Sequence, residues 1–162
     1  MNILFVCTAN ISRSYFAEML FRNEAKQNAL DYIAISSAGT HAHDGNPPDP
    51  KMVDYLAEMG VLVKAHKAKC ITKDLLDWAD HIFVMEKAHL EIIERQFPEV
   101  KDKIDLLGRY MSDDQLVDDI IDPYGRSLFH YRLAHSQISM AIRNLIKKFL
   151  IDQNAQDKNH SD

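Results

Sequence analysis

Residues 2–14 read NILFVCTANISRS and decide the fold. The apolar start of this stretch predicts a short buried strand, and the apolar positions at residues 16–21 predict a helix, with Ser14 as the expected N-cap. Cys7 would then lie where the strand ends and face the N-terminus of the helix. Because the loop from Cys7 to Arg13 is short, we expect its backbone N–H groups to converge on one point and to cradle a tetrahedral oxyanion.

The rest of the chain alternates between strand patterns and helix patterns. Strands are predicted at residues 32–37, 81–85 and 103–107, and helices at residues 51–59, 72–79, 87–97 and 128–151. Such alternation is typical of a parallel sheet that is covered on both faces. We therefore predict an α/β fold with three layers, in which helices flank both faces of a four-stranded parallel sheet and a phosphate-binding loop joins the first strand to the first helix. Residues 61–70 fit either a short strand or a loop, and residues 108–125 predict an extended acidic loop.

Length and composition restrict the organisation of the chain. With 162 residues, 46% of them hydrophobic, the sequence can build one domain with a core, which we assign to residues 1–151, followed by a polar and disordered tail over residues 152–162. No segment approaches the roughly 18 consecutive apolar residues that a membrane span needs. The net charge is −5 and the 19 basic residues are scattered, so neither nucleic acid nor a membrane is expected as a partner.

The two cysteines, Cys7 and Cys70, are too few for a disulfide scaffold, and we expect a reducing, cytoplasmic setting. The helix N-terminus, the converging amides and the charge of Arg13 all favour the thiolate form of Cys7. The same groups can bind the oxygens of a phosphate monoester, with Arg13 as a planar, bidentate donor. A cysteine at the end of a buried strand can also be a small apolar residue without a function. The strand before the loop and the helix after it favour phosphate chemistry.

Several segments together resemble one family. Residues 6–14, VCTANISRS, are similar to the signature of the low-molecular-weight protein tyrosine phosphatases. Five further motifs follow in the order of that family: SAGT at 37–40, GNPPD at 45–49, AHKA at 65–68, DLL at 105–107 and DPYG at 122–125. The resemblance spans residues 1 to about 150. It implies the predicted fold and a two-step hydrolysis through a phosphocysteine, with neither a metal nor another cofactor.

The resemblance also assigns roles to individual residues. Cys7 would be the nucleophile, Arg13 would bind the phosphate and the charge of the transition state, and Asp122 would act first as general acid and then as general base. The chemistry agrees, because a phenol or alcohol leaving group needs a proton, and an aspartate that precedes a proline is held in an extended loop from which it can reach a pocket. Asp122 also fits an acidic surface loop without catalytic function.

The remaining predicted site residues surround the phosphate. The resemblance implies that Ser14 hydrogen-bonds the sulfur, that the Asn10 side chain holds the loop in its strained shape, and that His66 supports Asn10. Ser14 is also explained as an N-cap, Asn10 as a turn residue and His66 as a structural histidine. The predicted substrate-binding residues are Thr8, Ala9, Asn10, Ile11, Ser12, Ser14 and Tyr124.

Three positions depart from the family pattern. Ala42 stands where relatives usually carry an aromatic wall residue, and Tyr124 precedes Gly125 where a second aromatic is common, so the predicted substrates are phosphotyrosine proteins or smaller or wider phosphomonoesters. Inorganic phosphate is expected as product and inhibitor. Ser12 stands where many relatives have a second cysteine, so an oxidised Cys7 would lack a neighbouring thiol.

Two other functions fit the same loop. An arsenate reductase uses this fold but needs further thiols, and only Cys70 is available. A non-enzymatic module that binds phosphoproteins would suit the altered walls but leaves the nucleophile and the acid unexplained. His41, His43, Asp44 and Asp49 contain metal-ligating side chains without a recognisable spacing, so no metal site is predicted.

Overall fold

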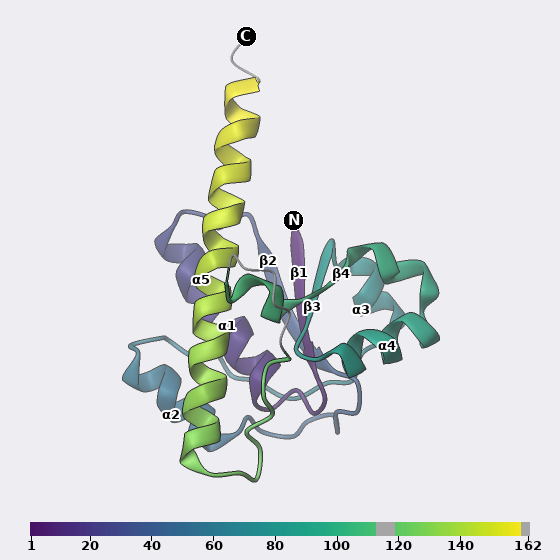
Figure 1. Ribbon diagram of the computed structural model, residues 1–162, viewed down its shortest axis with the longest axis vertical. Helices are drawn as coiled ribbons and strands as arrows, with labels where there is room; N and C mark the ends of the chain where they lie inside the picture. Colours follow the sequence, from purple (N-terminus) through teal and green to yellow (C-terminus); the bar gives the residue numbers. More distant parts are fainter. Residues whose placement is uncertain (113–118, 160–162) are drawn as a thin grey trace.

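The computed structural model describes residues 1–112 and 119–159, with side chains through residue 155. Its centre is a sheet of four strands in the order β2-β1-β3-β4, and every neighbouring pair is parallel (Figure 1). The strands are β1 (Asn2–Cys7), β2 (Ala34–Gly39), β3 (His81–Val84) and β4 (Ile104–Leu106). The four-stranded parallel sheet predicted from the sequence is confirmed.

Helices cover both faces of the sheet. They are α1 (Arg13–Gln27), α2 (Pro50–Glu58), α3 (Lys73–Trp78), α4 (Lys87–Gln96) and α5 (Leu128–Asn159), with the 3₁₀ helices η1 (Pro98–Lys103) and η2 (Leu107–Tyr110) beside β4. In Figure 1, α1, α2 and α5 lie on one side of the sheet, and α3 and α4 lie on the other. The order of strands and helices therefore agrees with the prediction.

The alternation of side chains along β1 explains why both faces are covered. Ile3, Phe5 and Cys7 point into the core cluster beneath α1 and α5, whereas Leu4 and Val6 point into the cluster beneath α3 and α4. Successive side chains of a strand face opposite sides of the sheet, so a continuous apolar strand must be buried on both. β1 is therefore a central strand, and its carboxyl end delivers Cys7 to the edge where ligands of parallel sheets bind.

The first helix begins two residues earlier than predicted. Its N-cap is Ser12, whose side chain makes no capping hydrogen bond, and Arg13 is its first residue. The prediction that Ser14 is the N-cap was wrong, because the loop turns back before Ser14 and directs that hydroxyl towards Cys7. The capping pattern was read correctly at Thr72, whose side chain accepts the N–H of Leu75.

In the middle of the chain, the structure shifts the predicted bounds of β2 and decides between the two predictions for residues 61–70. β2 begins at Ala34 and runs to Gly39, later than predicted, because its pairing with β1 continues until Gly39 lies opposite Cys7. Between residues 61 and 70 the only sheet pairing is an isolated bridge from Cys70 to Gly39. This segment is therefore a loop that closes against β2.

The predicted boundary after residue 151, between the domain and a polar tail, does not coincide with the end of the last helix. α5 continues to Asn159, and its last turns project beyond the rest of the fold (Figure 1). The apolar stripe stops at Ile151 because packing stops there, but residues 152–159 contain neither proline nor glycine and extend a helix that is already nucleated. In the predicted acidic loop, residues 113–118 lie outside the described residues. Among the described helices, none combines the length and the apolar character that crossing a bilayer requires.

Gly39 lies directly beneath the loop that follows β1. A Cβ atom built at this position would overlap the carbonyl oxygen of Thr8 and would lie 2.9 Å from the Cβ of Ala42 and 3.0 Å from the backbone N of Asn10. The loop can approach β2 this closely only because residue 39 has no side chain.

Replacing Gly39 by alanine should therefore displace the loop. We expect Gly39→Ala to lower the free energy of unfolding by about 1–3 kcal/mol, as overpacking does, and to weaken the binding of inorganic phosphate. Gly45→Ala is the matched control, because Gly45 has a φ of 90° but open space around it, so this variant should lose stability without losing phosphate binding. Denaturant titration and calorimetry measure both quantities, and equal phosphate affinities in the two variants would contradict the explanation.

Candidate active site

The sulfur of Cys7 is buried at the carboxyl end of β1 and is surrounded by donors. The backbone N–H of Asn10 donates to Sγ at 3.3 Å, and the Ser14 hydroxyl lies 3.0 Å from Sγ. The thiol is 3% exposed. An amide N–H and a hydroxyl are therefore both within hydrogen-bond distance of the sulfur.

Asn10 fixes the shape of this loop. Its φ of 55° lies in the left-handed region, where residues other than glycine are uncommon. Its Oδ1 accepts the backbone N–H of Lys69 at 3.0 Å, which orients the amide so that Nδ2 donates to Ser14 at 3.0 Å and to Ser37 at 2.8 Å. Strain of this kind persists only where the surroundings impose it. The Asn10 side chain is therefore held by three hydrogen bonds.

These bonds also determine where the hydroxyl hydrogens point. Because Ser14 Oγ accepts from Asn10, its own hydrogen is free to donate to Cys7 Sγ. By the same argument, Ser37 Oγ donates to Glu18 Oε2 at 2.5 Å, and Glu18 is itself paired with Arg22 at 2.9 Å. A chain of hydrogen bonds thus runs from a surface arginine to the sulfur.

The His66 side chain contacts the backbone of Asn10 rather than the Asn10 side chain. Its Nε2 lies 2.8 Å from the carbonyl oxygen of Asn10, and its ring packs against Tyr15 at 4.7 Å between centroids. The carbonyl oxygen accepts, so Nε2 carries the hydrogen. His66 therefore holds the strained residue in place from the outside, consistent with the support predicted for it.

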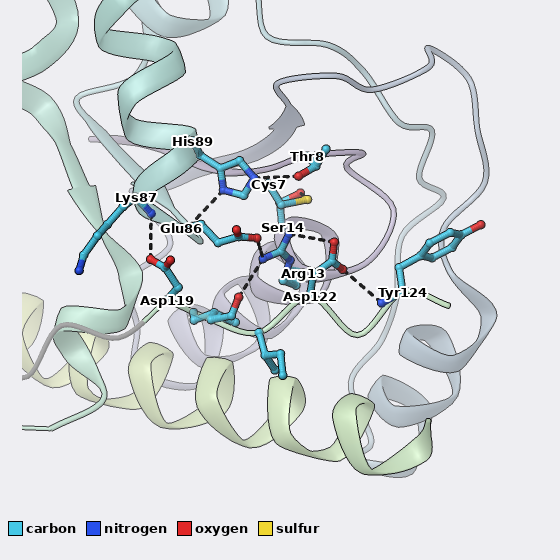
Figure 2. Close-up of polar contacts among 12 residues, drawn as sticks. Cys7, Thr8, Arg13, Ser14, Glu86, Lys87, His89, Asp119, Asp122 and Tyr124 are labelled. Carbon is cyan, nitrogen blue, oxygen red and sulfur yellow. Dashed lines mark hydrogen bonds and ion pairs between the residues drawn. The ribbon is translucent and has the colours of Figure 1, made fainter. Parts of the chain in front are cut away.

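Arg13 is nearly completely buried, and acidic groups neutralise its charge. Nη1 donates to the Glu86 carboxylate and, at 2.8 Å, to the carbonyl oxygen of Ile120, while Nη2 lies 3.3 Å from Asp122 Oδ2 (Figure 2). The Arg13 side chain is 2% exposed, so an unpaired guanidinium here would be very costly. Glu86 and Ile120 fix one edge of the fork, and Nη2 faces Asp122.

Asp122 is half-exposed and lies at the mouth of the same site. Its Oδ1 accepts the backbone N–H of Tyr124 at 3.2 Å. The preceding residues are tied to the β3–α4 junction, because Ile120 N–H donates to the Met85 carbonyl at 2.9 Å and Asp119 Oδ1 accepts the N–H of Lys87 at 2.8 Å. The structure thus brings Asp122 to Arg13 from a distant part of the sequence.

The other predicted binding residues line the loop. Thr8, Ala9 and Ile11 are half-buried, and the Ile11 carbonyl accepts the N–H of Asp49 at 2.8 Å. Ser12 is buried, and its Oγ has no hydrogen-bond partner among the described residues. Tyr124 is 63% exposed and stands at the rim, with its side chain directed away from Arg13 in Figure 2.

Two residues of the site were missed by the sequence analysis. Glu86 and His89 lie at the start of α4, immediately after β3, and the pattern of residues 87–97 was read only as an amphipathic helix. The usable signal was their position, since residues that follow the carboxyl ends of parallel strands meet at one edge of the sheet. Among the described residues there is no group of three potential metal ligands.

Buried His89 connects α4 to the loop. Its Nδ1 accepts the N–H of Glu86 at 3.1 Å, and its Nε2 lies 2.8 Å from the Thr8 hydroxyl. Burial, followed by the positive charge of Arg13, lowers the pKa of His89 to about 4, against the opposing effect of Glu86. The ring is therefore neutral around pH 7.

Known proteins match almost the whole chain. A sequence model described as "Low molecular weight phosphotyrosine protein phosphatase" matches residues 2–157. The chain belongs to this family. The low molecular weight phosphotyrosine protein phosphatase of Sus scrofa is 36% identical over 152 residues, which are 91% of this chain and 94% of that protein. A protein-arginine-phosphatase of Geobacillus stearothermophilus is 34% identical over 151 residues, or 93% of this chain and 97% of that protein.

A solved structure of the family has the same fold. The low molecular weight protein tyrosine phosphatase from T. tengcongensis superposes with a TM-score of 0.83 at 34% identity, covering 91% of this chain and 99% of the other. The resemblance recognised from the sequence motifs is thereby confirmed. As a low molecular weight phosphatase, the chain is a hydrolase with a cysteine at the carboxyl end of its first strand.

The pKa of His89 makes the stability of the fold depend on pH. Below pH 6.5 the unfolded chain protonates His89, whereas the folded chain does so only near pH 4, so the free energy of unfolding should fall as the pH falls from 6.5 to 4. The contribution amounts to about 3 kcal/mol. Urea titrations at several pH values should show a shallower fall for His89→Gln. His41→Gln at an exposed position is the control, and identical slopes in His89→Gln and the unmutated protein would contradict the prediction.

The position of Cys70 predicts how Cys7 responds to peroxide. Cys7 pairs with Gly39, and Gly39 pairs with Cys70 on its other side, so the two cysteines are about two strand spacings, or roughly 10 Å, apart. A disulfide needs Cα atoms within about 7 Å. Mass spectrometry after mild oxidation should therefore find sulfenic and sulfinic acids on Cys7, and a Cys7–Cys70 disulfide as the main product would contradict this expectation.

Proposed function

We propose that this chain hydrolyses phosphotyrosine in proteins through a phosphocysteine on Cys7, with Arg13 as the phosphate-binding residue and Asp122 as general acid and base. The observation that carries the proposal is the contact between Arg13 and Asp122 at the end of the loop that begins with Cys7. Arg13 Nη2 lies 3.3 Å from Asp122 Oδ2, and in the same loop the backbone N–H of Asn10 donates to Cys7 Sγ at 3.3 Å. Nucleophile, anion-binding fork and proton donor thus serve one pocket.

In the first step, the Cys7 thiolate attacks phosphorus. A sulfur–phosphorus bond forms, the bond from phosphorus to the phenolic oxygen breaks, and protonated Asp122 gives its hydrogen to that oxygen, so tyrosine leaves neutral. The loop amides and Arg13 bind the equatorial oxygens, on which the charge of the transition state lies. Glu86 and Ile120 fix Nη1, which keeps the guanidinium oriented while Nη2 remains directed to the pocket.

In the second step, the Asp122 carboxylate takes a proton from water while the water oxygen attacks phosphorus. The sulfur–phosphorus bond breaks and its electron pair returns to sulfur, where the Ser14 hydroxyl and the Asn10 amide stabilise the thiolate. Inorganic phosphate remains in the cradle that bound the substrate, so we expect it to be a competitive inhibitor. Thr8, Ala9, Ile11 and Ser12 contribute loop backbone to this binding. No metal or cofactor enters either step.

A protein-arginine phosphatase is the second candidate. Two relatives bear that name, from Geobacillus stearothermophilus and Bacillus subtilis, and they are 34% and 31% identical to this chain. Ala42 places no aromatic side chain beside the substrate site, so a wider range of phosphorylated groups can enter that site. We favour phosphotyrosine because the exposed ring of Tyr124 at the rim can stack on a phenol.

The two remaining alternatives have less support. An arsenate reductase would need a second thiol near Cys7, and Cys70 lies on the far side of Gly39. A non-enzymatic module would not need Asp122 beside Arg13. We expect the enzyme to work in the cytoplasm, where reducing conditions preserve the thiol.

The mechanism predicts different defects for its two reacting side chains. Cys7→Ser should abolish hydrolysis of p-nitrophenyl phosphate, and Asp122→Asn should lower kcat about 10²- to 10⁴-fold on a phosphotyrosine peptide, but less on p-nitrophenyl phosphate, whose leaving group needs no proton. Asp54→Asn, on the exposed side of α2, removes the same charge and should leave kcat unchanged. Full activity of Cys7→Ser would exclude the phosphocysteine.

The substrate class can be decided with paired peptides. Peptides of one sequence carrying phosphotyrosine or phosphoarginine should give the higher kcat/KM for phosphotyrosine, and Tyr124→Ala should reduce that preference. A higher kcat/KM for phosphoarginine would favour the second candidate. Tight binding of either peptide without turnover by the unmutated protein would favour the binding module.

A further inference from the structure

The contact between His89 and Thr8 has a direction that the structure determines. His89 Nδ1 faces the backbone N–H of Glu86 at 3.1 Å, and an N–H can only donate. Nδ1 of a neutral ring must therefore be the acceptor, which places the ring hydrogen on Nε2. Nε2 in turn lies 2.8 Å from Thr8 Oγ1, so His89 donates to Thr8 (Figure 2).

The direction of this hydrogen bond determines which role is left to the Thr8 hydroxyl hydrogen. Because Oγ1 accepts from His89, its own hydrogen is available to a different acceptor. Thr8 follows Cys7 directly, is half-exposed, and has its backbone held by the N–H of His41, which donates to the Thr8 carbonyl at 2.9 Å. Figure 2 shows the Thr8 side chain beside Cys7, on the side of the loop that faces α4. A phosphoryl group on Cys7, the neighbouring residue, would offer such an acceptor.

We propose that His89 is a positioning residue that acts through Thr8, holding the hydroxyl so that its hydrogen is donated to the phosphoryl group bound at Cys7. This inference rests on the proposed phosphatase function and adds one side-chain donor to the backbone amides and Arg13. A hydrogen bond to a charged acceptor is stronger than one between neutral groups, so the donor stabilises the bound phosphate and the transition state.

The surroundings of His89 keep its ring in the required form. Arg13 from α1, Glu86 at the start of α4, and Asp119 and Asp122 from the loop before α5 are the charged groups that act on it, and burial is the largest influence. A doubly protonated ring would direct Nδ1–H at the N–H of Glu86, so the contact with α4 requires the neutral ring. At 3% exposure, water does not compete for Nε2.

The test separates the two nitrogens of the ring. His89→Asn keeps an acceptor near the position of Nδ1 and loses the donor to Thr8, whereas His89→Gln places an amide donor near the position of Nε2. At the other end of the contact, Thr8→Val removes the hydroxyl and Thr8→Ser keeps it. Each variant, and the double variant Thr8→Val with His89→Asn, is assayed for kcat/KM on p-nitrophenyl phosphate and for the inhibition constant of inorganic phosphate.

The expected results form a cycle. His89→Asn and Thr8→Val should each lower kcat/KM about tenfold and raise the phosphate inhibition constant, the effect of one charged hydrogen bond. In the Thr8→Val background, His89→Asn should change kcat/KM by less than about twofold, because the hydroxyl that it positions is gone. His89→Gln and Thr8→Ser should stay within about threefold of the unmutated protein. A merely structural role for His89 would give the same loss in both backgrounds.

Three results would overturn the inference: unchanged kcat/KM in His89→Asn, equal losses from His89→Asn with and without the Thr8 hydroxyl, or equal activities of Thr8→Val and Thr8→Ser. If His89→Asn does not fold, the comparison of Thr8→Val with Thr8→Ser still decides whether the hydroxyl contributes. Failure of the proposed function is distinguishable, because then the unmutated protein itself would not hydrolyse p-nitrophenyl phosphate.

Discussion

The left-handed conformation of Asn10 is the constraint on which the site depends. With a φ of 55°, this residue reverses the chain within the loop and directs its own N–H at the Cys7 sulfur. Such a conformation costs about 1–2 kcal/mol for a residue with a side chain, and three hydrogen bonds of the Asn10 amide offset that cost. Because those bonds reach Ser14, Ser37 and Lys69, the loop is tied to α1, to β2 and to the segment that closes against β2.

The site also requires that the buried positive charge of Arg13 remain able to bind an anion. Arg13 is held by Glu86 from the β3–α4 junction and by the carbonyl of Ile120 from the loop before α5. Both partners bind Nη1, so the guanidinium is neutralised and oriented on one edge while its other edge meets Asp122. The parallel sheet makes this possible, since the carboxyl ends of β1 and β3 lie side by side and bring Arg13 and Glu86 together.

Sequence reasoning is most informative where chemistry and local pattern coincide. Cys7 and Arg13 could be proposed as site residues because a strand, a short loop and a helix are all readable within 20 residues, and Asp122 because it precedes proline in a family motif. For Ser14 the N-cap reading was wrong, whereas the hydrogen bond to sulfur that the family resemblance implied is present, because the turn at Asn10 places Ser14 beside Cys7. Glu86 and His89 were missed because their roles arise from contacts between strands that are distant in sequence.

The length of α5 shows a different limit of prediction from the sequence. The amphipathic stripe marks where a helix packs and ends at Ile151, whereas the backbone of α5 stays helical to Asn159. Likewise, nothing in the composition near Gly39 indicates that the phosphate loop rests on it. Such close approaches are properties of the assembled fold, whereas residue chemistry was readable from the chain.

The most direct test of this account is the affinity of the Asn10→Ala variant for inorganic phosphate, measured by calorimetry at pH 7. If the Asn10 side chain preorganises the loop, the dissociation constant should rise at least about tenfold while the circular dichroism spectrum stays native. An Asn10→Ala variant that binds phosphate as tightly as the unmutated protein would contradict the claim that this residue shapes the site.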